Sequence, residues 1–564
     1  MTSTLTTDVL IVGGGATGAG LVRDLARRGL RCVLVEKSDL GTGTTGRYHG
    51  LLHSGGRYVV KDPVAARECI DENVILRRIA PATIEDTGGW FVATPNDPDD
   101  YADGFAAACG AAGVPCEEAP VGDLLRREPA LNPAIRRAFR VPDASLEPWQ
   151  LIEGNVDDAR SRGARVMPYH RVVSMRRSGG RILGVDVADV RSGSMVRVAP
   201  RIVVSAAGAW AGQGAAMAGA ELAMKPGKGT MLIFNQRMTD TVVNRLHPPG
   251  DGDIMVPVHS VAILGTTEIT VDDPDRYGIG RDEVAELMDE GELLFPELRR
   301  MRLLRAYAGV RPLYQDAPAD DEQSADGRTI SRAHVVIDHG RRDDIDNLVS
   351  IVGGKVTTYR LMAEQTADLV CRKLGVDARC TTADEPLPGQ AGDRARYYWL
   401  GHRLAEHEAA GGGDADLICE CEMLTRDDID AFLDERWPCS LDDVRRGTRL
   451  GMGPCQGGFC TFRAAGMVAE RVAGGGADGN ARSAGENAAS AAGFADRAMI
   501  EFLGERFAGT RPIAWGRQLQ ELWVTAGIYQ GVLGSRTLPG DGSTDLAAAI
   551  AMPAAPAEAA DADR

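Results

Sequence analysis

Long apolar runs, a positive charge balance and a dense set of cysteines are all missing from this 564-residue sequence. No apolar run approaches the roughly 18 residues that a membrane-spanning helix needs, and the N-terminus lacks the charged, apolar and small-residue pattern of a secretory signal. The net charge of −17 opposes binding to nucleic acid and direct docking on anionic lipid, since both need a basic face. We therefore expect a cytoplasmic protein with no nucleic-acid partner.

Lysine is scarce, at six of the 63 basic residues, so arginine carries almost all of the positive charge. Codon bias in a GC-rich genome and adaptation to a salty cytoplasm explain this usage equally well. Eleven cysteines in so long a chain do not indicate a disulfide framework. In a reducing compartment such cysteines are expected to be buried or to bind metal.

The N-terminal stretch 8–36 has the pattern of a dinucleotide-binding unit. A short apolar run leads into the turn GGGATG, and a helical pattern and a second apolar run follow. Gly13 permits the tight turn, Gly15 lets a pyrophosphate approach the backbone, and Gly18 lets the helix pack closely on the strands. Glu36 ends the second run, where a carboxylate can bond a ribose diol. A glycine turn without a ligand is the alternative interpretation.

A glycine- and threonine-rich loop, DLGTGTTGR (39–47), follows directly and contains Thr44 and Thr45. Its backbone and hydroxyl groups can hydrogen-bond a cofactor, although a surface turn is the ordinary alternative. A loop at this place favours FAD over NAD, because the longer flavin needs a second wall. The stretch LVSIVGGKVTTYR (348–360) repeats the order of strand, glycine turn and helix start.

Two cysteine pairs form the second constellation. Cys419 and Cys421 are spaced C-x-C, and Cys455 and Cys460 are spaced C-x4-C. Four thiolates in two close pairs can hold zinc or an iron–sulfur cluster. Structural zinc prefers C-x2-C, so this spacing favours an iron–sulfur cluster. Zinc and unrelated buried cysteines remain the alternatives.

Several motifs together resemble one enzyme family. The segments GGGATGAG, TGTTGRYHGLLHSGGRY, ILGTTEI, AYAGVRPL, ISRAH and VGGKVTTYRLMAE resemble those of the FAD-dependent glycerol-3-phosphate dehydrogenases. The added cysteine module and the RPIAWG segment are similar to those of the catalytic A subunits in the anaerobic, three-subunit members. Residues 416–472 resemble the bacterioferritin-associated ferredoxin domain, which binds a [2Fe–2S] cluster. The resemblance covers about residues 8–535.

The resemblance implies oxidation of sn-glycerol 3-phosphate to dihydroxyacetone phosphate with FAD. It also implies that electrons leave through B and C partner subunits to membrane quinone, with the chain held peripherally on the cytoplasmic membrane by those partners. Two departures from the family pattern stand out. Met231 occupies a position where single-subunit relatives carry a histidine, and C-x4-C is wider than the C-x2-C of the ferredoxin.

The resemblance also predicts site residues, because oxidising a phosphorylated secondary alcohol needs a base for the hydroxyl proton and arginine forks for the phosphate. The predicted catalytic residues are His53, as base or flavin contact, and Arg311. Arg57, Arg311 and Arg332 are the predicted substrate binders. The predicted cofactor-binding residues are Gly13, Gly15, Gly18, Glu36, Thr44, Thr45, Gly353, Gly354, Lys355 and Thr357. The predicted ligands of a [2Fe–2S] cluster, or of zinc as the alternative, are Cys419, Cys421, Cys455 and Cys460.

The predicted fold is α/β, and α+β overall. A Rossmann-like FAD-binding domain with an inserted mixed-sheet substrate domain precedes a small helical iron–sulfur domain and a C-terminal helical module. The predicted boundaries are 1–375 for the oxidoreductase domain (FAD-binding segments 1–75, 145–225 and 330–375; substrate-domain segments 76–144 and 226–329), 376–415 for a linker, 416–473 for the [2Fe–2S] domain, 474–492 for a flexible linker, 493–536 for the helical module and 537–564 for a disordered tail.

Two other functions remain open at this point. One is a flavin oxidoreductase of the same fold that acts on an amine or a 2-hydroxy acid, which a panel of substrates would distinguish. The other is a non-catalytic electron-transfer subunit, which would show no flavin bleaching with glycerol 3-phosphate.

Overall fold

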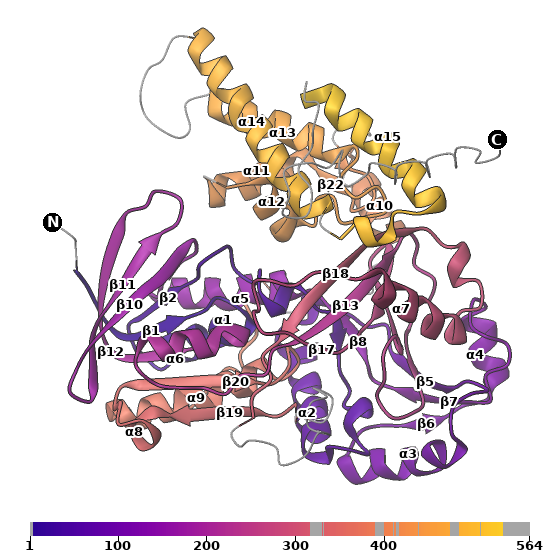
Figure 1. Cartoon of the computed structure of the whole chain (residues 1–564), viewed down its shortest axis with the longest axis horizontal. Helices are drawn as coiled ribbons and strands as arrows, with labels where there is room; N and C mark the ends of the chain where they lie inside the picture. The colour runs from indigo at the N-terminus through magenta and orange to yellow at the C-terminus, as the bar shows by residue number, and fades with distance from the viewer. Residues whose placement is uncertain are drawn as a thin grey trace, which may run out of the picture.

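The computed structural model describes residues 4–315, 330, 332–389, 400–409, 411–412, 417–437, 439–473, 484–507 and 509–533. Two sheets with their covering helices form the lower portion of the molecule in Figure 1, and a helical module drawn in orange and yellow lies above them. The module consists of residues that follow both sheets in the sequence, so the C-terminal region of the chain folds back over the N-terminal region.

The first sheet has eight strands in the described residues. They are β1 (Thr4–Val12), β2 (Cys32–Val35), β9 (Arg165–Met167), β10 (His170–Ser178), β11 (Arg181–Asp189), β12 (Met195–Ser205), β19 (His334–Asp338) and β20 (Leu348–Gly353). β9, β2, β1, β12 and β20 run parallel in this order, with Val9 opposite both Cys32 and Ile202. β10, β11 and β12 form an antiparallel meander, and β19 pairs antiparallel with β20.

Apolar side chains alternate between the two faces of the first sheet. Val9 and Ile11 pack with the helices α1 (Ala16–Arg27), α5 (Pro148–Ser161) and α9 (Tyr359–Leu374), whereas Leu10 packs on the opposite side with α6 (Ala211–Met217) and the meander. Because both faces are covered, the strands are continuously apolar where they pair at the centre, over Val9–Val12, Cys32–Val35 and Ile202–Val204, as parallel strands in layered α/β folds are. The predicted α/β fold class is confirmed.

The second sheet has nine strands in the described residues and is mixed. Its strands are β5 (Gly89–Ala93), β6 (Glu117–Glu118), β7 (Arg137–Val141), β13 (Gly227–Phe234), β14 (Val242–Arg245), β15 (Ile254–Val258), β16 (Val261–Gly265), β17 (Ile269–Thr270) and β18 (Leu303–Arg311). β14 and β5 pair in parallel, and the other pairs are antiparallel. The helices α4 (Val121–Arg127) and α7 (Arg281–Leu294) pack into one core, and α2 (Pro63–Ile79) and α3 (Asp99–Ala112) into another.

A small sheet of β3 (Leu51–Leu52), β4 (Ile84–Glu85) and β8 (Ala144–Leu146) lies between the segments of the two larger sheets in the sequence. α8 (His339–Arg342) connects β19 to the strand before α9. None of the helices among the described residues combines the length and apolarity that crossing a bilayer requires.

The described residues of the module form a hairpin, β21 (Leu417–Cys419) and β22 (Leu424–Thr425), and five α-helices. These are α11 (Arg426–Arg436), α12 (Leu441–Thr448), α13 (Cys460–Ala473), α14 (Ala484–Phe507) and α15 (Gly516–Leu533). Thr425 and Ser440 begin α11 and α12 with reciprocal capping boxes, which satisfy backbone N–H groups at the helix starts. A shared core that includes Leu433, Phe502 and Tyr529 joins the cysteine-bearing segment to α14 and α15.

The predicted linkers differ from the structure in extent. α10 (Leu400–Ala409) lies inside the predicted linker 376–415, and Leu387 in the same stretch is buried, with its N–H bonded to Ile79 O at 2.8 Å. α14 begins at Ala484, inside the predicted linker 474–492. Alanine and glutamate favour helix even where glycine and serine lower the apolar content. The predicted disordered tail, 537–564, lies outside the described residues.

Candidate functional site

A cavity of about 830 Å³ lies where the first sheet, the second sheet and the module meet. Gly13 and Gly15 line it just after β1, and Gly13 has a φ of +112°. A Cβ on Gly13 would lie 2.5 Å from Ala206 O, and one on Gly18 would lie 1.9 Å from Gly13 O. Only glycine fits these two positions, so the turn holds the start of α1 directly against the strands at the edge of the cavity.

Glu36 and the threonine loop form the next wall of the cavity. The Glu36 carboxylate accepts hydrogen bonds from Gly14 N at 2.7 Å and Ser38 N at 3.0 Å, while burial raises its pKa. Thr45 Oγ1 accepts from Ala16 N at 3.1 Å, and Thr44 Oγ1 donates to Val310 O at 2.6 Å. These bonds fix the loop between α1 and β18, so the loop forms one wall of the cavity.

The far wall comes from the turn after β20. Gly353 and Gly354 have φ values of +77° and +76°, and both line the cavity with Lys355. Thr357 Oγ1 accepts from His53 N at 3.1 Å, which ties this turn to the segment after β3. Eight of the ten predicted cofactor residues line the cavity, whereas Gly18 and Thr357 support it from behind. The size of the cavity, the glycine turn and the acid at its edge fit a flavin dinucleotide.

A buried carboxylate joins two of the three predicted substrate arginines. Glu268 Oε2 accepts from Arg311 Nη1 at 2.6 Å and from Arg332 Nη2 at 3.0 Å. The Glu268 side chain is 3% exposed, and its Oε1 has no hydrogen-bond partner among the described residues. Burial and the charge of Arg332 lower the pKa of Arg311 to about 10, against the opposing effect of Glu268. Two partly buried cations therefore share one buried carboxylate, which leaves net positive charge at this place.

The two histidines of the glycine-rich segment lie next to these arginines. The ring centroids of His49 and His53 are 5.8 Å apart, and His53 lies 5.4 Å from Tyr58. Burial, with the charges of Arg57 and Arg311, lowers the pKa of His49 to about 3. Burial also holds the pKa of His53 well below its ordinary value, and nearby cations add to the effect. Both imidazoles are therefore neutral near pH 7 and can accept a proton.

Arg57 and Lys355 complete the polar cluster. Arg57 Nη1 donates to Asp253 Oδ2 at 2.8 Å, and Lys355 Nζ donates to Arg332 O at 3.2 Å and lies 4.6 Å from the centroid of the Tyr58 ring. Met231, by contrast, is a buried residue of β13 with no proton-accepting group. The structure thus brings the predicted His53, Arg57, Arg311 and Arg332 together.

Two residues of this cluster were missed in the sequence. Glu268 lies inside the ILGTTEI segment, but nothing in that segment pairs an acid with arginines far along the chain. His49 is not among the residues predicted from the sequence. The available signal for Glu268 was a carboxylate in the short loop between β16 and β17, because loops at strand ends often carry site residues.

The four predicted metal-ligating cysteines converge in the module. Cys421 Sγ and Cys455 Sγ are 3.9 Å apart. Hydrogen bonds among the four thiols lower the pKa of Cys419 and Cys455 and raise that of Cys421 and Cys460. A Cβ on Gly453 would lie 2.7 Å from Cys421 Sγ, so the backbone approaches the thiols closely. Within the described residues, however, no group of three or more His, Cys, Asp or Glu side chains has the geometry to hold a metal ion.

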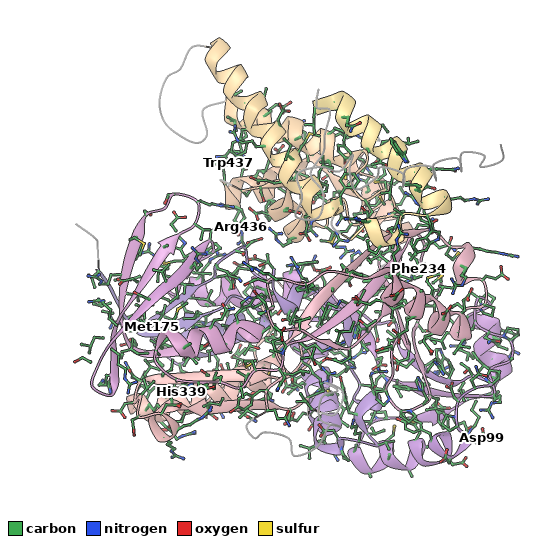
Figure 2. All side chains as sticks on the ribbon, in the orientation of Figure 1. Asp99, Met175, Phe234, His339, Arg436 and Trp437 are labelled. Atoms are coloured by element: carbon green, nitrogen blue, oxygen red, sulfur yellow. The ribbon has the colours of Figure 1, made fainter. Side chains whose placement is uncertain are left out.

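A buried ion network docks the module on the cavity. Arg449 Nη1 donates to Glu147 Oε2 at 2.5 Å, and Arg449 Nε donates to Glu422 Oε2 at 3.1 Å. Glu422 follows Cys421 and also contacts His259 Nδ1 at 3.1 Å. Arg449 and Glu147 line the cavity, so the module forms one of its walls. In Figure 2 the labelled Arg436 lies on the side of the module that faces the first sheet, where it pairs with Glu153 of α5.

The fold and the cavity define a flavin-dependent oxidoreductase. The family model for FAD dependent oxidoreductases matches residues 8–369. The structure of the glycerol-3-phosphate dehydrogenase from Bacillus halodurans complexed with FAD is similar with a TM-score of 0.56 at 20% identity, over 93% of this chain and 91% of that one. Glycine oxidase from Geobacillus kaustophilus is similar with a TM-score of 0.53 at 23% identity, over 69% and 100%. These two likenesses show the fold alone.

Sequence relatives show which family of FAD-dependent oxidoreductases this chain resembles. The chain is 41% identical over 545 residues to the A subunit of the anaerobic glycerol-3-phosphate dehydrogenase from Escherichia coli K12, covering 93% of this chain and 97% of the relative. It is 41% identical over 538 residues to the A1 subunit of the corresponding enzyme from Haloferax volcanii, covering 91% and 88%. The chain belongs to this family of anaerobic glycerol-3-phosphate dehydrogenase A subunits, within the FAD-dependent oxidoreductases.

Proposed function

We propose that this chain oxidises sn-glycerol 3-phosphate to dihydroxyacetone phosphate with FAD as its cofactor. The names of the relatives support this substrate, and one observation of the structure carries it. Arg311 and Arg332 converge on the single carboxylate of Glu268, beside the neutral His53. A phosphate dianion fits a buried place that has two forked cations and one anion. An amine substrate does not fit it.

The chain's own groups would bind and orient the substrate. Glu268 holds the guanidinium groups of Arg311 and Arg332, and Arg311 Nη2 also donates to Thr266 Oγ1 and Thr267 O. A phosphate would bond the donors that these contacts leave. Arg57 is held by Asp253 and adds positive charge at the same side of the cluster. Because an arginine fork bonds two oxygens at once, the phosphate fixes the orientation of the secondary alcohol before reaction.

His53 is the proposed base. Its lowered pKa keeps the imidazole neutral, so a ring nitrogen can accept the hydroxyl proton. The hydride leaves the carbon that bears this hydroxyl group. When bound, FAD supplies the acceptor for that hydride, and the alcohol becomes a ketone by losing a hydride and a proton.

The direct test is anaerobic titration of the purified, FAD-containing chain with sn-glycerol 3-phosphate, followed by flavin absorbance. We expect bleaching with glycerol 3-phosphate and none with glycine, proline or lactate. Arg311→Ala should raise KM strongly, because losing one partner of a buried charge pair costs about 2–5 kcal/mol. Arg300→Ala is the matched control, because Arg300 forms an exposed ion pair with Glu297 at the surface. Bleaching by an amino acid alone, or wild-type kinetics of Arg311→Ala, would contradict the proposal.

We further propose that the four cysteines hold a [2Fe–2S] cluster that carries electrons from FAD toward B and C partner subunits and quinone. The convergence of four thiols beside glycine backbone supports a cluster, with a structural zinc as the other candidate. In the Cys455→Ser/Cys460→Ser variant, flavin bleaching and direct dye reduction should survive, whereas transfer to quinone through the partners should fail. Iron and sulfide analysis with low-temperature EPR reports the cluster. Stoichiometric zinc, or full quinone activity without iron, would contradict this role.

The proposed membrane association depends on partner subunits. Trp523 and Val524 of α15 are exposed, as is Trp515 before it, so this helix has apolar side chains available for a partner. The Trp523→Ser/Val524→Ser variant should lose co-sedimentation with membranes while its flavin activity stays unchanged. Membrane association that persists after deletion of residues 461–564 would contradict a role for this region of the chain.

A further inference from the structure

Four arginines surround one glutamate where β18, α12 and α14 meet. We call this cluster the arginine pocket and define it as Arg47, Arg305, Arg445, Arg506 and Glu505, all of which line the cavity. Arg305, Arg445 and Arg506 are 8%, 6% and 7% exposed. They come from the second sheet and from two helices of the module, which lies above β18 in Figure 1.

The carboxylates of the arginine pocket do not balance its cations. Glu505 lies 3.8 Å from Arg305 Nη2 and 4.0 Å from Arg47 Nη2, and Arg445 Nε donates to Asp442 Oδ1 at 2.7 Å. Arg506 instead donates to the neutral oxygens Gly451 O and Gln456 Oε1. Among the described residues, two carboxylates thus pair with four guanidinium groups.

Donor groups are also left over. Arg305 Nε and Arg506 Nε are buried and make no hydrogen bond with any residue that the structure describes. A buried donor without a partner costs free energy, and a buried charge without a counter-charge costs more. Both costs fall if an anion with several oxygens occupies the place.

Electrostatics agree with this imbalance. Burial, with the charges of the neighbouring arginines, lowers the pKa of both Arg305 and Arg506. Burial alone would raise the pKa of Glu505, but the surrounding arginines, Arg305 foremost, lower it to about 2. The pocket therefore favours added negative charge.

The Arg305 end of the arginine pocket is separate from the substrate cluster and from the cofactor turn, whereas Arg47 ends the threonine loop of the cofactor wall and its carbonyl lies against Gly309. Arg305, Tyr307, Gly309 and Arg311 alternate along one face of β18, opposite Ile233, Met231, Gly229 and Gly227 of β13. Six residues of strand at about 3.3 Å each place the Cα atoms of Arg305 and Arg311 about 20 Å apart. Thr44 bonds Val310 O, so the wall of the cofactor turn is about 16 Å along the strand from Arg305.

We propose that the arginine pocket binds a phosphate group of a ligand other than FAD: free phosphate or a phosphate monoester. Guanidinium forks match phosphate oxygens, and a dianion offsets the two unbalanced cations. The binding site would lie at the opposite end of β18 from the substrate cluster. The glycine turn after β1 is the expected place of the FAD phosphates, so they do not occupy the arginine pocket. Phosphate binding in the pocket does not depend on which substrate is oxidised.

The test uses the full chain with FAD bound, in phosphate-free buffer. Orthophosphate, AMP and glycerol 2-phosphate are titrated separately by calorimetry, and thermal midpoints are recorded with each. We expect saturable binding of at least one probe and a midpoint that rises with its concentration, as mass action requires for a ligand of the folded state. AMP binding more tightly than orthophosphate would indicate a nucleotide, and equal binding would indicate free phosphate.

Two variants assign the binding to the pocket. Arg305→Gln/Arg506→Gln should weaken binding at least tenfold and abolish the rise in midpoint, while keeping FAD content. Arg276→Gln/Arg300→Gln, with two exposed arginines, is the matched control and should bind as the wild type does. If the pocket variant fails to load FAD, the single Arg506→Gln variant is used in its place. Absence of saturable binding to the FAD-loaded wild type, or unchanged binding by the pocket variants, would overturn the proposal.

Discussion

Replacing Arg449 by methionine tests whether the module is docked by buried charge. The guanidinium bonds Glu422 of the module and Glu147 at the start of α5, and the side chains of Arg449, Glu422 and Glu147 are 7%, 1% and 7% exposed. Removing one member of a buried ion network leaves uncompensated charge and costs about 3–5 kcal/mol. That range corresponds to a change of roughly 150- to 4,000-fold in the equilibrium it governs. We expect Arg449→Met to lower the urea midpoint and to speed FAD release.

A double-mutant cycle separates stranded charge from lost packing. Adding Glu147→Gln to Arg449→Met removes one stranded carboxylate, so the double variant should be more stable than Arg449→Met alone. Arg463→Met is the control, because Arg463 pairs with Glu420 at the module surface and exposed pairs contribute about 0–1 kcal/mol. Urea unfolding followed by flavin fluorescence gives the comparison. If Arg449→Met unfolds and releases FAD like the control, buried charge does not dock the module.

Three further outcomes are expected. Glu36→Ala removes an acceptor that holds a backbone N–H of the glycine turn at 2.7 Å. The binding free energy of FAD, measured by equilibrium dialysis, should become about 1.5–3 kcal/mol less favourable. Unchanged FAD affinity would refute the assignment. Gly18→Ala places a methyl 1.9 Å from Gly13 O and should abolish FAD loading, whereas Gly104→Ala on α3 meets no described atom within 4 Å and should load normally. Because burial lowers the pKa of His53, its neutral form should persist as pH falls well below 6.5; nitrogen NMR that shows a charged ring at pH 6 would contradict this.

The first sheet and its cofactor turn were predictable because local patterns specify them. Strand, glycine turn, helix, strand and acid follow one another within 8–36, and each glycine has a steric reason that a sequence can express. Gly18 illustrates this, since no side chain fits against Gly13 O. The match to the FAD-dependent oxidoreductase family confirms the predicted cofactor class.

The pairing of charges was not predictable, because it depends on contacts between distant residues. Glu268 lies 43 residues from Arg311 and 64 from Arg332 along the chain, and Arg449 lies 302 from Glu147. No periodicity or spacing rule relates such positions. The helices in the predicted linkers were missed for another reason: the stretches were assigned from glycine and polar content, although α14 begins with alanine and glutamate.

The sequence predicts that the cysteine module and the FAD site are separate domains. In the structure, residues of both line one cavity. Arg449 lines that cavity and also bonds Glu422, the residue after Cys421. A substitution that unfolds the module would therefore open the cofactor cavity to water as well as remove the thiols. Electron routing can be separated from substrate oxidation only by changes that keep the module docked. Cysteine-to-serine changes meet this condition if the shared core around Phe502 and Tyr529 holds the helices in place.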